Sequence, residues 1–124
     1  MPDNLQTQLP LHKAAEDRAA IDFDLPDSIF GFHAQQAIEK LLKALIAWRG
    51  DTYPHTHDLR QLSTLCIESG EQLPVLPWSV INLQEYAVLL RYDTSDILPP
   101  ADRDKIRSTV DILAAFVRAR VLPE

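Results

Sequence analysis

Residues 32–49 read Phe32-His-Ala-Gln-Gln-Ala-Ile-Glu-Lys-Leu-Leu-Lys-Ala-Leu-Ile-Ala-Trp-Arg49, and this stretch decides the fold. The segment is strongly helical and strongly apolar, and a helix that is apolar on most of its circumference is mostly buried. It nevertheless keeps polar side chains at Gln35, Gln36, Glu39, Lys40 and Lys43. Charges kept on such a helix are usually paired or used. We therefore expect a central helix whose polar residues either pair with other side chains or take part in function.

On a helical wheel, this segment and the residues before it present two faces that bear apolar side chains. The main stripe consists of Phe30, Ala34, Ala37, Ile38, Leu41, Leu45 and Trp48. The second face carries Phe32, Gln35, Glu39, Leu42 and Ile46. The remaining wedge holds His33, Gln36, Lys40 and Lys43. Two interpretations stay open: this is the central helix of a bundle, or its second face meets another copy of the chain in a homodimer.

Prolines divide the rest of the chain into further helical patterns, expected at about 11–23, 28–48, 58–68, 78–93 and 100–121. Asp27 and Asp58 are candidate N-caps, with Gln61 completing a capping box after Asp58, and Gly50 fits the position just past a helix end. Few strand-like alternations occur, so the chain is predicted to be all-α. Short connections favour an antiparallel up-and-down bundle of four core helices plus one short helix. A length of 124 residues indicates a single domain, 1–124.

Charge is unevenly distributed along the chain. The net charge of −6 opposes non-specific binding to phosphate backbones. Residues 33–60, however, carry four Lys and Arg side chains against three carboxylates, together with three of the four histidines. Any anion site is therefore expected in this segment, and the alternative is a solvated basic face.

The sequence gives little support for a membrane protein, a secreted protein, a catalytic cysteine or a metal site. No uncharged run is long enough to cross a membrane, and no signal peptide is evident, so we expect a cytoplasmic protein. The single Cys66 lies in an apolar context typical of an inert core thiol. His55 and His57 are too few ligands for a metal site, and we expect neither a metal nor a cofactor. In the structural interpretation, Thr56 or Asp58 caps the following helix and His57 fixes the turn by hydrogen bonding.

Three segments together carry a resemblance to a known family. They are Phe32-His-Ala-Gln-Gln-Ala-Ile-Glu-Lys-Leu-Leu-Lys-Ala-Leu45, then Thr56-His-Asp-Leu59, then Tyr86…Leu90-Arg-Tyr-Asp93. Their order and spacing resemble the HEPN domain (higher eukaryotes and prokaryotes nucleotide-binding) over about residues 12–120. The resemblance implies a bundle of four core helices plus a short one, usually dimeric. Many prokaryotic members are encoded beside a minimal nucleotidyltransferase, with which they form a toxin–antitoxin-like pair. Some members bind nucleotides, and others are metal-independent RNases.

The RNase motif of that family is incomplete in this chain. The RNase members carry an Arg followed, after four to six residues, by a His near the end of the later core helix. Arg91 occupies the matching place, but Asp96, Ile97 and Leu98 stand where the histidine should follow. Without that imidazole, cleavage by the 2′-hydroxyl loses a general acid or base typically worth ~10²–10⁴-fold. The sequence therefore favours a non-catalytic protein.

We expect a homodimer with a groove that binds a nucleotide, a partner nucleotidyltransferase, or both. The expected nucleotide- or anion-binding residues are Lys40, Lys43, His57, Arg91 and Tyr92. The alternative is a ribonuclease toxin with an atypical site, in which His57 approaches Arg91 in the fold or from a second subunit. A third interpretation is a purely structural partner whose acidic exterior serves solubility.

Overall fold

The computed structural model describes residues 5–77, 80, 83 and 100–122. Its helices are α1 (Leu5–Ala20), α2 (Asp27–Trp48), α3 (Leu59–Glu68) and α6 (Pro100–Val121). Within these residues there is no strand, so the prediction of an all-α fold is confirmed. The helix expected at about 78–93 lies outside the described residues, apart from the buried Val80 and Leu83. No helix in this part of the chain is both long enough and apolar enough to cross a membrane.

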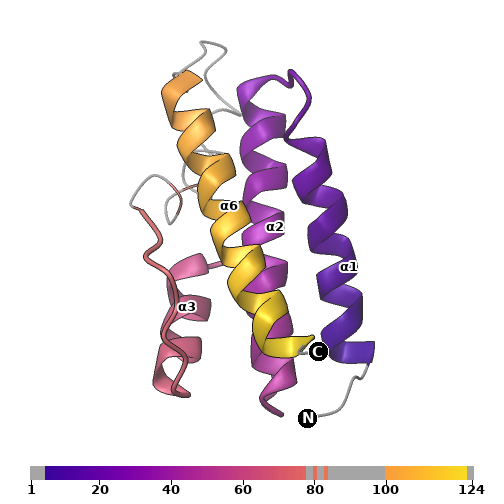
Figure 1. The fold of residues 1–124 in the computed structure, drawn as a ribbon, viewed down its shortest axis with the longest axis vertical. Coiled ribbons are helices and arrows are strands. Elements are labelled where there is room, and N and C mark those ends of the chain that lie inside the picture. The colour runs from indigo at the N-terminus through magenta and orange to yellow at the C-terminus, as the bar shows by residue number, and fades with distance from the viewer. Residues whose placement is uncertain (1–4, 78–79, 81–82, 84–99, 123–124) are drawn as a thin grey trace.

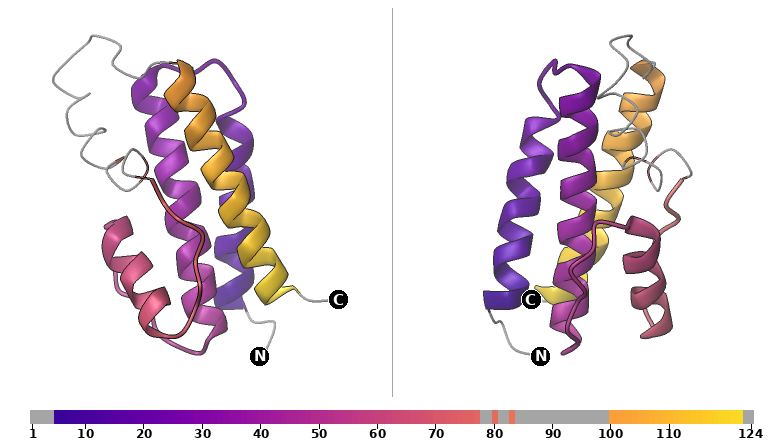
Figure 2. Two further views of the ribbon diagram at one scale, coloured as in Figure 1. Left: turned by 60° about the vertical axis from the view of Figure 1, so that its left-hand side comes forward. Right: turned by 180° about the vertical axis from the view of Figure 1, so that it is seen from behind.

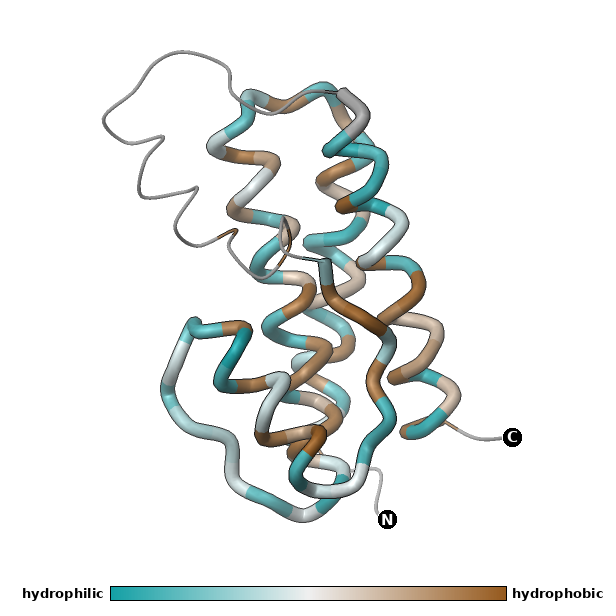
Figure 3. The backbone as a smooth tube through the Cα atoms, turned by 90° about the vertical axis from the view of Figure 1, so that its left-hand side faces the viewer, coloured by the Kyte–Doolittle hydropathy of each residue, from teal (hydrophilic) through white to brown (hydrophobic). Residues whose placement is uncertain are grey.

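The long α2 lies at the centre of the bundle (Figure 1). The helices α1 and α6 lie along it, and α1 runs in the opposite direction to both α2 and α6. The shorter α3 lies on the far side of α2 from α1, as the two further views in Figure 2 show. Apolar residues recur along all four helices (Figure 3). Buried apolar side chains of α1, α3 and α6 form one core cluster with those of α2.

Burial of α2 follows from its composition. Its main stripe is inaccessible to solvent at Phe30, Ile38 and Leu45, and its second face is equally buried at Leu42. Full burial of a side chain of this size contributes about 1.5–3 kcal/mol relative to leaving it exposed. Of the two interpretations left open by the sequence, the structure shows the first, in which α2 is the central helix of a bundle.

The ends of the helices explain how neighbouring segments are positioned. Gly50, with φ of 88°, ends α2, and the N–H groups of Gly50 and Asp51 donate to the carbonyls of Ala47 and Ile46 at 3.0 and 3.2 Å. This is a Schellman motif, in which a left-handed glycine satisfies the last carbonyls of a helix. At the other end of the loop, Asp58 caps α3 by accepting the backbone N–H of Arg60 at 3.0 Å. Both caps were predicted from the sequence. The predicted capping box is not completed by Gln61, because the Asp58 N–H donates to Thr56 Oγ1 at 3.1 Å instead.

Two boundaries differ from the prediction. Asp27 is the first residue of α2 rather than its cap, because Pro26 occupies the cap position without a side-chain hydrogen bond. The buried Asp27 carboxylate instead pairs with the Arg103 guanidinium of α6, and so ties the start of α2 to that helix. The helix α1 begins at Leu5, so Pro10 lies inside it and removes one backbone donor.

A buried carboxylate fixes the chain that follows α3. Gly70, with φ of 106°, ends α3 in a second Schellman motif, and Glu71 comes next. The Glu71 carboxylate accepts hydrogen bonds from Arg120 Nε and Nη2, both at 2.9 Å, and pairs with Arg49 at the end of α2. The hydrogen bonds from Arg120, and then the one from Arg49, hold the pKa of Glu71 below its ordinary value despite burial. Glu71 therefore joins the ends of α2 and α6.

Candidate functional site

A group of charged side chains lies where α1, α2 and the loop before α3 meet. Its first buried carboxylate is Glu39 on α2, which is only 4% exposed. Glu39 Oε1 lies 2.8 Å from His57 Nδ1, and Oε2 accepts a hydrogen bond from Lys43 Nζ at 3.0 Å. One helical turn earlier, the buried Gln35 donates from Nε2 to the backbone carbonyl of His57 at 3.1 Å. Two polar residues of α2 therefore hold His57 by its ring and by its main chain.

The second buried carboxylate is Asp17 on α1, which is 8% exposed. Asp17 Oδ2 accepts a hydrogen bond from Lys40 Nζ at 2.6 Å, and Oδ1 lies 2.9 Å from His33 Nδ1. Lys40 and His33 both belong to the polar wedge of α2 that the sequence identified. Because a buried carboxylate must be paired or hydrogen-bonded, Asp17 explains why α2 keeps these residues on the side that faces α1.

The lysine and histidine side chains of this site keep hydrogen-bonding groups that their carboxylate partners do not use. A lysine ammonium has three N–H donors, and the carboxylate partners of Lys40 and Lys43 each use one of them. The His57 side chain is 66% exposed, and with a carboxylate on Nδ1 its Nε2 is the nitrogen left for other partners. The site can therefore donate to anionic oxygens, and His57 offers a ring nitrogen for proton transfer.

A cavity of about 380 Å³ opens beside these residues. Its polar wall contains Lys13 of α1, Glu39, Lys40 and Lys43 of α2, and Tyr53 of the following loop. Its other wall is formed by Leu5, Gln6, Leu9 and Pro10 at the start of α1. The Lys43 ammonium lies 5.5 Å from the centre of the Tyr53 ring, within the range of a cation–π contact. The volume lies within the range of about 300–1,000 Å³ that is typical of small-molecule sites.

The structure brings together part of the predicted anion site. Lys40, Lys43 and His57 gather around the two buried carboxylates, whereas Arg91 and Tyr92 lie outside the described residues. The structural interpretation of the loop also holds, because Asp58 caps α3 and the His57 ring is hydrogen-bonded to Glu39.

The predicted dimer face requires a correction. Gln35, Glu39, Leu42 and Ile46 are each at most 5% exposed in one chain, so their side chains are not available to a second copy. The reason is that α3 and the loop before it cover this face of α2, and Cys66 of α3 even reaches the backbone carbonyl of Leu42. Phe32 is the exception, at 51% exposed.

Sequence reasoning missed three residues of the site, which are Lys13, Asp17 and Tyr53. Asp17 left a readable signal, because it lies at helical spacing within the buried stripe Leu11, Ala14 and Ile21. A carboxylate in such a stripe requires a cationic partner from another element. Lys13 and Tyr53 left no such signal, since only the packing of α1 beside the loop brings them to the cavity.

Across the part of the chain that the structure describes, no group of three or more His, Cys, Asp or Glu side chains is arranged to hold a metal ion.

Comparison with known proteins identifies one relationship. A protein-family model described as HEPN domain matches residues 11–122. No curated protein and no solved structure gave a match to this chain.

Proposed function

This chain belongs to the HEPN domain family, and from that premise we propose that it is a non-catalytic, nucleotide-binding member of the family. The nucleotide would occupy the cavity between the start of α1 and the middle of α2. The single observation that carries this proposal is the cavity itself, where three lysines and a tyrosine ring line a space of about 380 Å³.

The cavity offers cationic groups for the phosphates of a nucleotide and apolar surfaces for its base. Lysine ammonium groups form charge-assisted hydrogen bonds with phosphate oxygens. Among the residues that the structure describes, Lys13 pairs with the exposed Glu16 at 3.8 Å. The Tyr53 ring and the apolar side chains of Leu5 and Leu9 offer surfaces against which a base can stack or pack. Because the cavity lies at the surface, salt should weaken the phosphate contacts.

Calorimetric titration with ATP, GTP and a short RNA tests this proposal. Lys13→Met should weaken nucleotide binding about tenfold, since a charge-assisted hydrogen bond is worth about 1.5–3 kcal/mol. The matched control is Lys105→Met, which removes an exposed lysine of α6 that does not line the cavity. If none of the three ligands produces heat with folded wild-type protein, or if both variants lose affinity equally, the proposed site is wrong.

The proposal includes two further partners, a second copy of the chain and a minimal nucleotidyltransferase acting with it as a toxin–antitoxin-like module. Family membership supports both. Light scattering on purified protein measures the first, and co-purification after co-expression with a neighbouring nucleotidyltransferase gene measures the second. Tight binding to the nucleotidyltransferase without any nucleotide binding would favour the purely structural interpretation.

One observation favours a second candidate function, a metal-independent ribonuclease. The buried Glu39 carboxylate holds His57 by Nδ1 and leaves Nε2 at the surface, as in a general acid–base pair. This function predicts RNA breakdown that persists in EDTA and causes growth arrest on expression. His57→Ala should abolish the breakdown and Glu39→Gln should reduce it. Breakdown that survives in a double Arg91→Ala, His57→Ala variant would exclude these residues as its source.

A further inference from the structure

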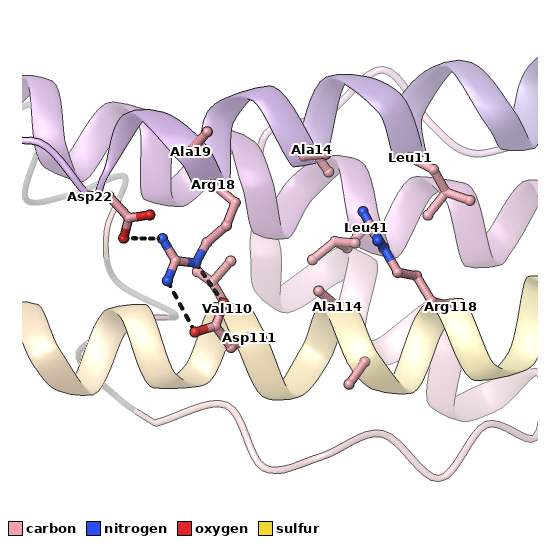
Figure 4. A pocket seen from close by; sticks show the side chains of 12 residues that line it. Leu11, Ala14, Arg18, Ala19, Asp22, Leu41, Val110, Asp111, Ala114 and Arg118 are labelled. Carbon is pink, nitrogen blue, oxygen red and sulfur yellow. Dashed lines mark hydrogen bonds and ion pairs between the residues drawn. The ribbon is translucent and has the colours of Figure 1, made fainter.

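A groove runs between α1 and α6, on the side of the bundle away from α3. Both helices pack on α2, and between them lies a hollow of about 520 Å³ with Leu41 and Val110 among its lining residues (Figure 4). Alanines from both helices line it and keep it shallow (Ala14, Ala15, Ala19, Ala114, Ala115). A second hollow of about 270 Å³ shares Leu11, Ala15 and Arg118 with the first and extends the groove toward Leu122. None of these residues belongs to the proposed nucleotide cavity.

One end of the groove is acidic. Arg18 of α1 donates from Nε and Nη2 to the Asp111 carboxylate of α6 at 2.6 and 3.1 Å, and from Nη1 to Asp22 at 2.7 Å (Figure 4). The hydrogen bonds that Arg18 donates to Asp111 are the main reason that the pKa of Arg18 is raised, so the guanidinium stays charged. Two carboxylates against one guanidinium leave this end with a net charge of −1.

The other end of the groove is basic. Arg118 lies at this end of the lining, away from Arg18 (Figure 4). It is exposed, and within the described ranges no carboxylate is paired with it. His12 lines the adjoining hollow and is also exposed. The groove therefore carries charges of opposite sign at its two ends.

A surface with this charge arrangement is complementary to itself. A two-fold axis through the middle of the groove, perpendicular to its length, would place the acidic end of each copy over the basic end of the other. Isologous contacts of this kind form the commonest class of oligomer, in which one patch meets the same patch on its partner. The short alanine side chains allow the partner's helices to approach closely, and the half-exposed Leu122 adds apolar surface at the rim.

We propose that the groove between α1 and α6 is the surface through which two copies of this chain pair. The inference rests on the homodimer of the proposed function and assigns it an interface different from the second face of α2. A free anion fits the groove less well, because binding at Arg118 would place its remainder toward the carboxylates at the acidic end.

A charge-exchange experiment tests the interface. Arg118→Glu makes both ends of the groove acidic, and Asp22→Arg makes both ends basic while the Arg18–Asp111 pair remains. Each variant alone should self-associate about tenfold or more weakly than the wild type, because the same repulsion occurs at both ends of the interface. An equimolar mixture should form heterodimers with an affinity close to that of the wild type. The readout is molar mass by light scattering and by sedimentation over a dilution series at low salt.

Recovery in the mixture shows that both variants are folded, so loss of fold cannot imitate the expected result. The matched control, Arg60→Glu, reverses an exposed charge on α3 and should leave dimer formation unchanged. A wild-type dimer that both variants retain, or a mixture that stays monomeric, would overturn the α1–α6 interface while leaving dimer formation to another surface. A wild-type monomer at every concentration would overturn the interface as well. Titration of these variants with nucleotide then decides the proposed ligand separately, because neither substitution touches its cavity.

Discussion

Replacing Glu71 with glutamine should weaken the fold by an amount that depends on pH. The Glu71 carboxylate is almost fully buried and receives two hydrogen bonds from Arg120 and one from Arg49. An amide has a similar shape, but it presents one acceptor oxygen and no charge to the two guanidinium groups. The substitution therefore removes charge-assisted pairing without opening a cavity.

The expected loss in the free energy of unfolding can be estimated from these contacts. A hydrogen bond that involves a charged group contributes about 1.5–3 kcal/mol net. Removing one partner of a buried ion pair costs about 3–5 kcal/mol when the remaining charge stays buried. Both arginine side chains are partly exposed and can rehydrate, so we expect the lower range, about 2–3 kcal/mol at pH 7. Arg120 also lies over the Trp48 ring at 4.9 Å, a contact that the substitution leaves in place.

The sign of the pH dependence follows from the lowered pKa of Glu71. A carboxylate whose pKa is lower in the folded state stabilises the fold above its unfolded pKa, and this contribution is lost as pH falls through the folded pKa. The difference between wild type and Glu71→Gln should therefore be largest at pH 7 and shrink below the ordinary glutamate pKa of 4.5.

Urea denaturation followed by circular dichroism at neutral and acid pH measures this difference. The control is Glu68→Gln, which removes an exposed carboxylate three residues earlier in the chain and should change the free energy of unfolding by less than about 0.5 kcal/mol. A difference for Glu71→Gln that stays constant from neutral to acid pH would refute the argument. A cost equal to that of Glu68→Gln would refute it as well.

Three further predictions concern α2 and α3. Leu42→Ala should lower the free energy of unfolding by about 2–5 kcal/mol in urea denaturation, because Leu42 is fully buried, whereas the exposed Ile67→Ala should change it by less than about 0.5 kcal/mol. Asp58→Ala should cost about 0.5–2 kcal/mol in the same assay by removing the cap of α3; an unchanged midpoint would contradict that role. Burial raises the pKa of Cys66 to about 12, so iodoacetamide should label the thiol only after unfolding; rapid labelling of folded protein would contradict its burial.

The central helix and its ends could be predicted from local signals. The apolar content of residues 32–48 predicted α2, Gly50 predicted its end, and Asp58 predicted the start of α3. These signals are local because helical spacing, a left-handed glycine and a cap all act within a turn or two of chain. Gly70 carries the same signal as Gly50 and went unrecognised, although it ends α3 in the same way.

The partners of the polar residues could not be predicted, because they come from distant parts of the chain. Periodicity showed that Glu39 lies on a face with Leu42, but it did not distinguish a second copy of the chain from α3 as the cover of that face. In the structure, α3 covers that face. The same limit applies to Asp27: its partner Arg103 is 76 residues away, so local signals predict a helix cap rather than an ion pair.

The buried carboxylates hold α2 in its place in the bundle. They also determine which cationic side chains are available to bind a ligand. Four of them join α2 to other segments, namely Asp17, Asp27, Glu39 and Glu71. Breaking such a pair leaves an uncompensated buried charge, so most of the cations opposite them are held by the fold and are only partly free for a ligand. Cations without a buried carboxylate partner therefore separate ligand binding from fold stability most clearly. Substituting Lys13 should change nucleotide affinity with little effect on the free energy of unfolding. Substituting Lys40 should change both quantities. Equal losses of stability for the two lysines would show that the cavity is a structural feature rather than a binding site.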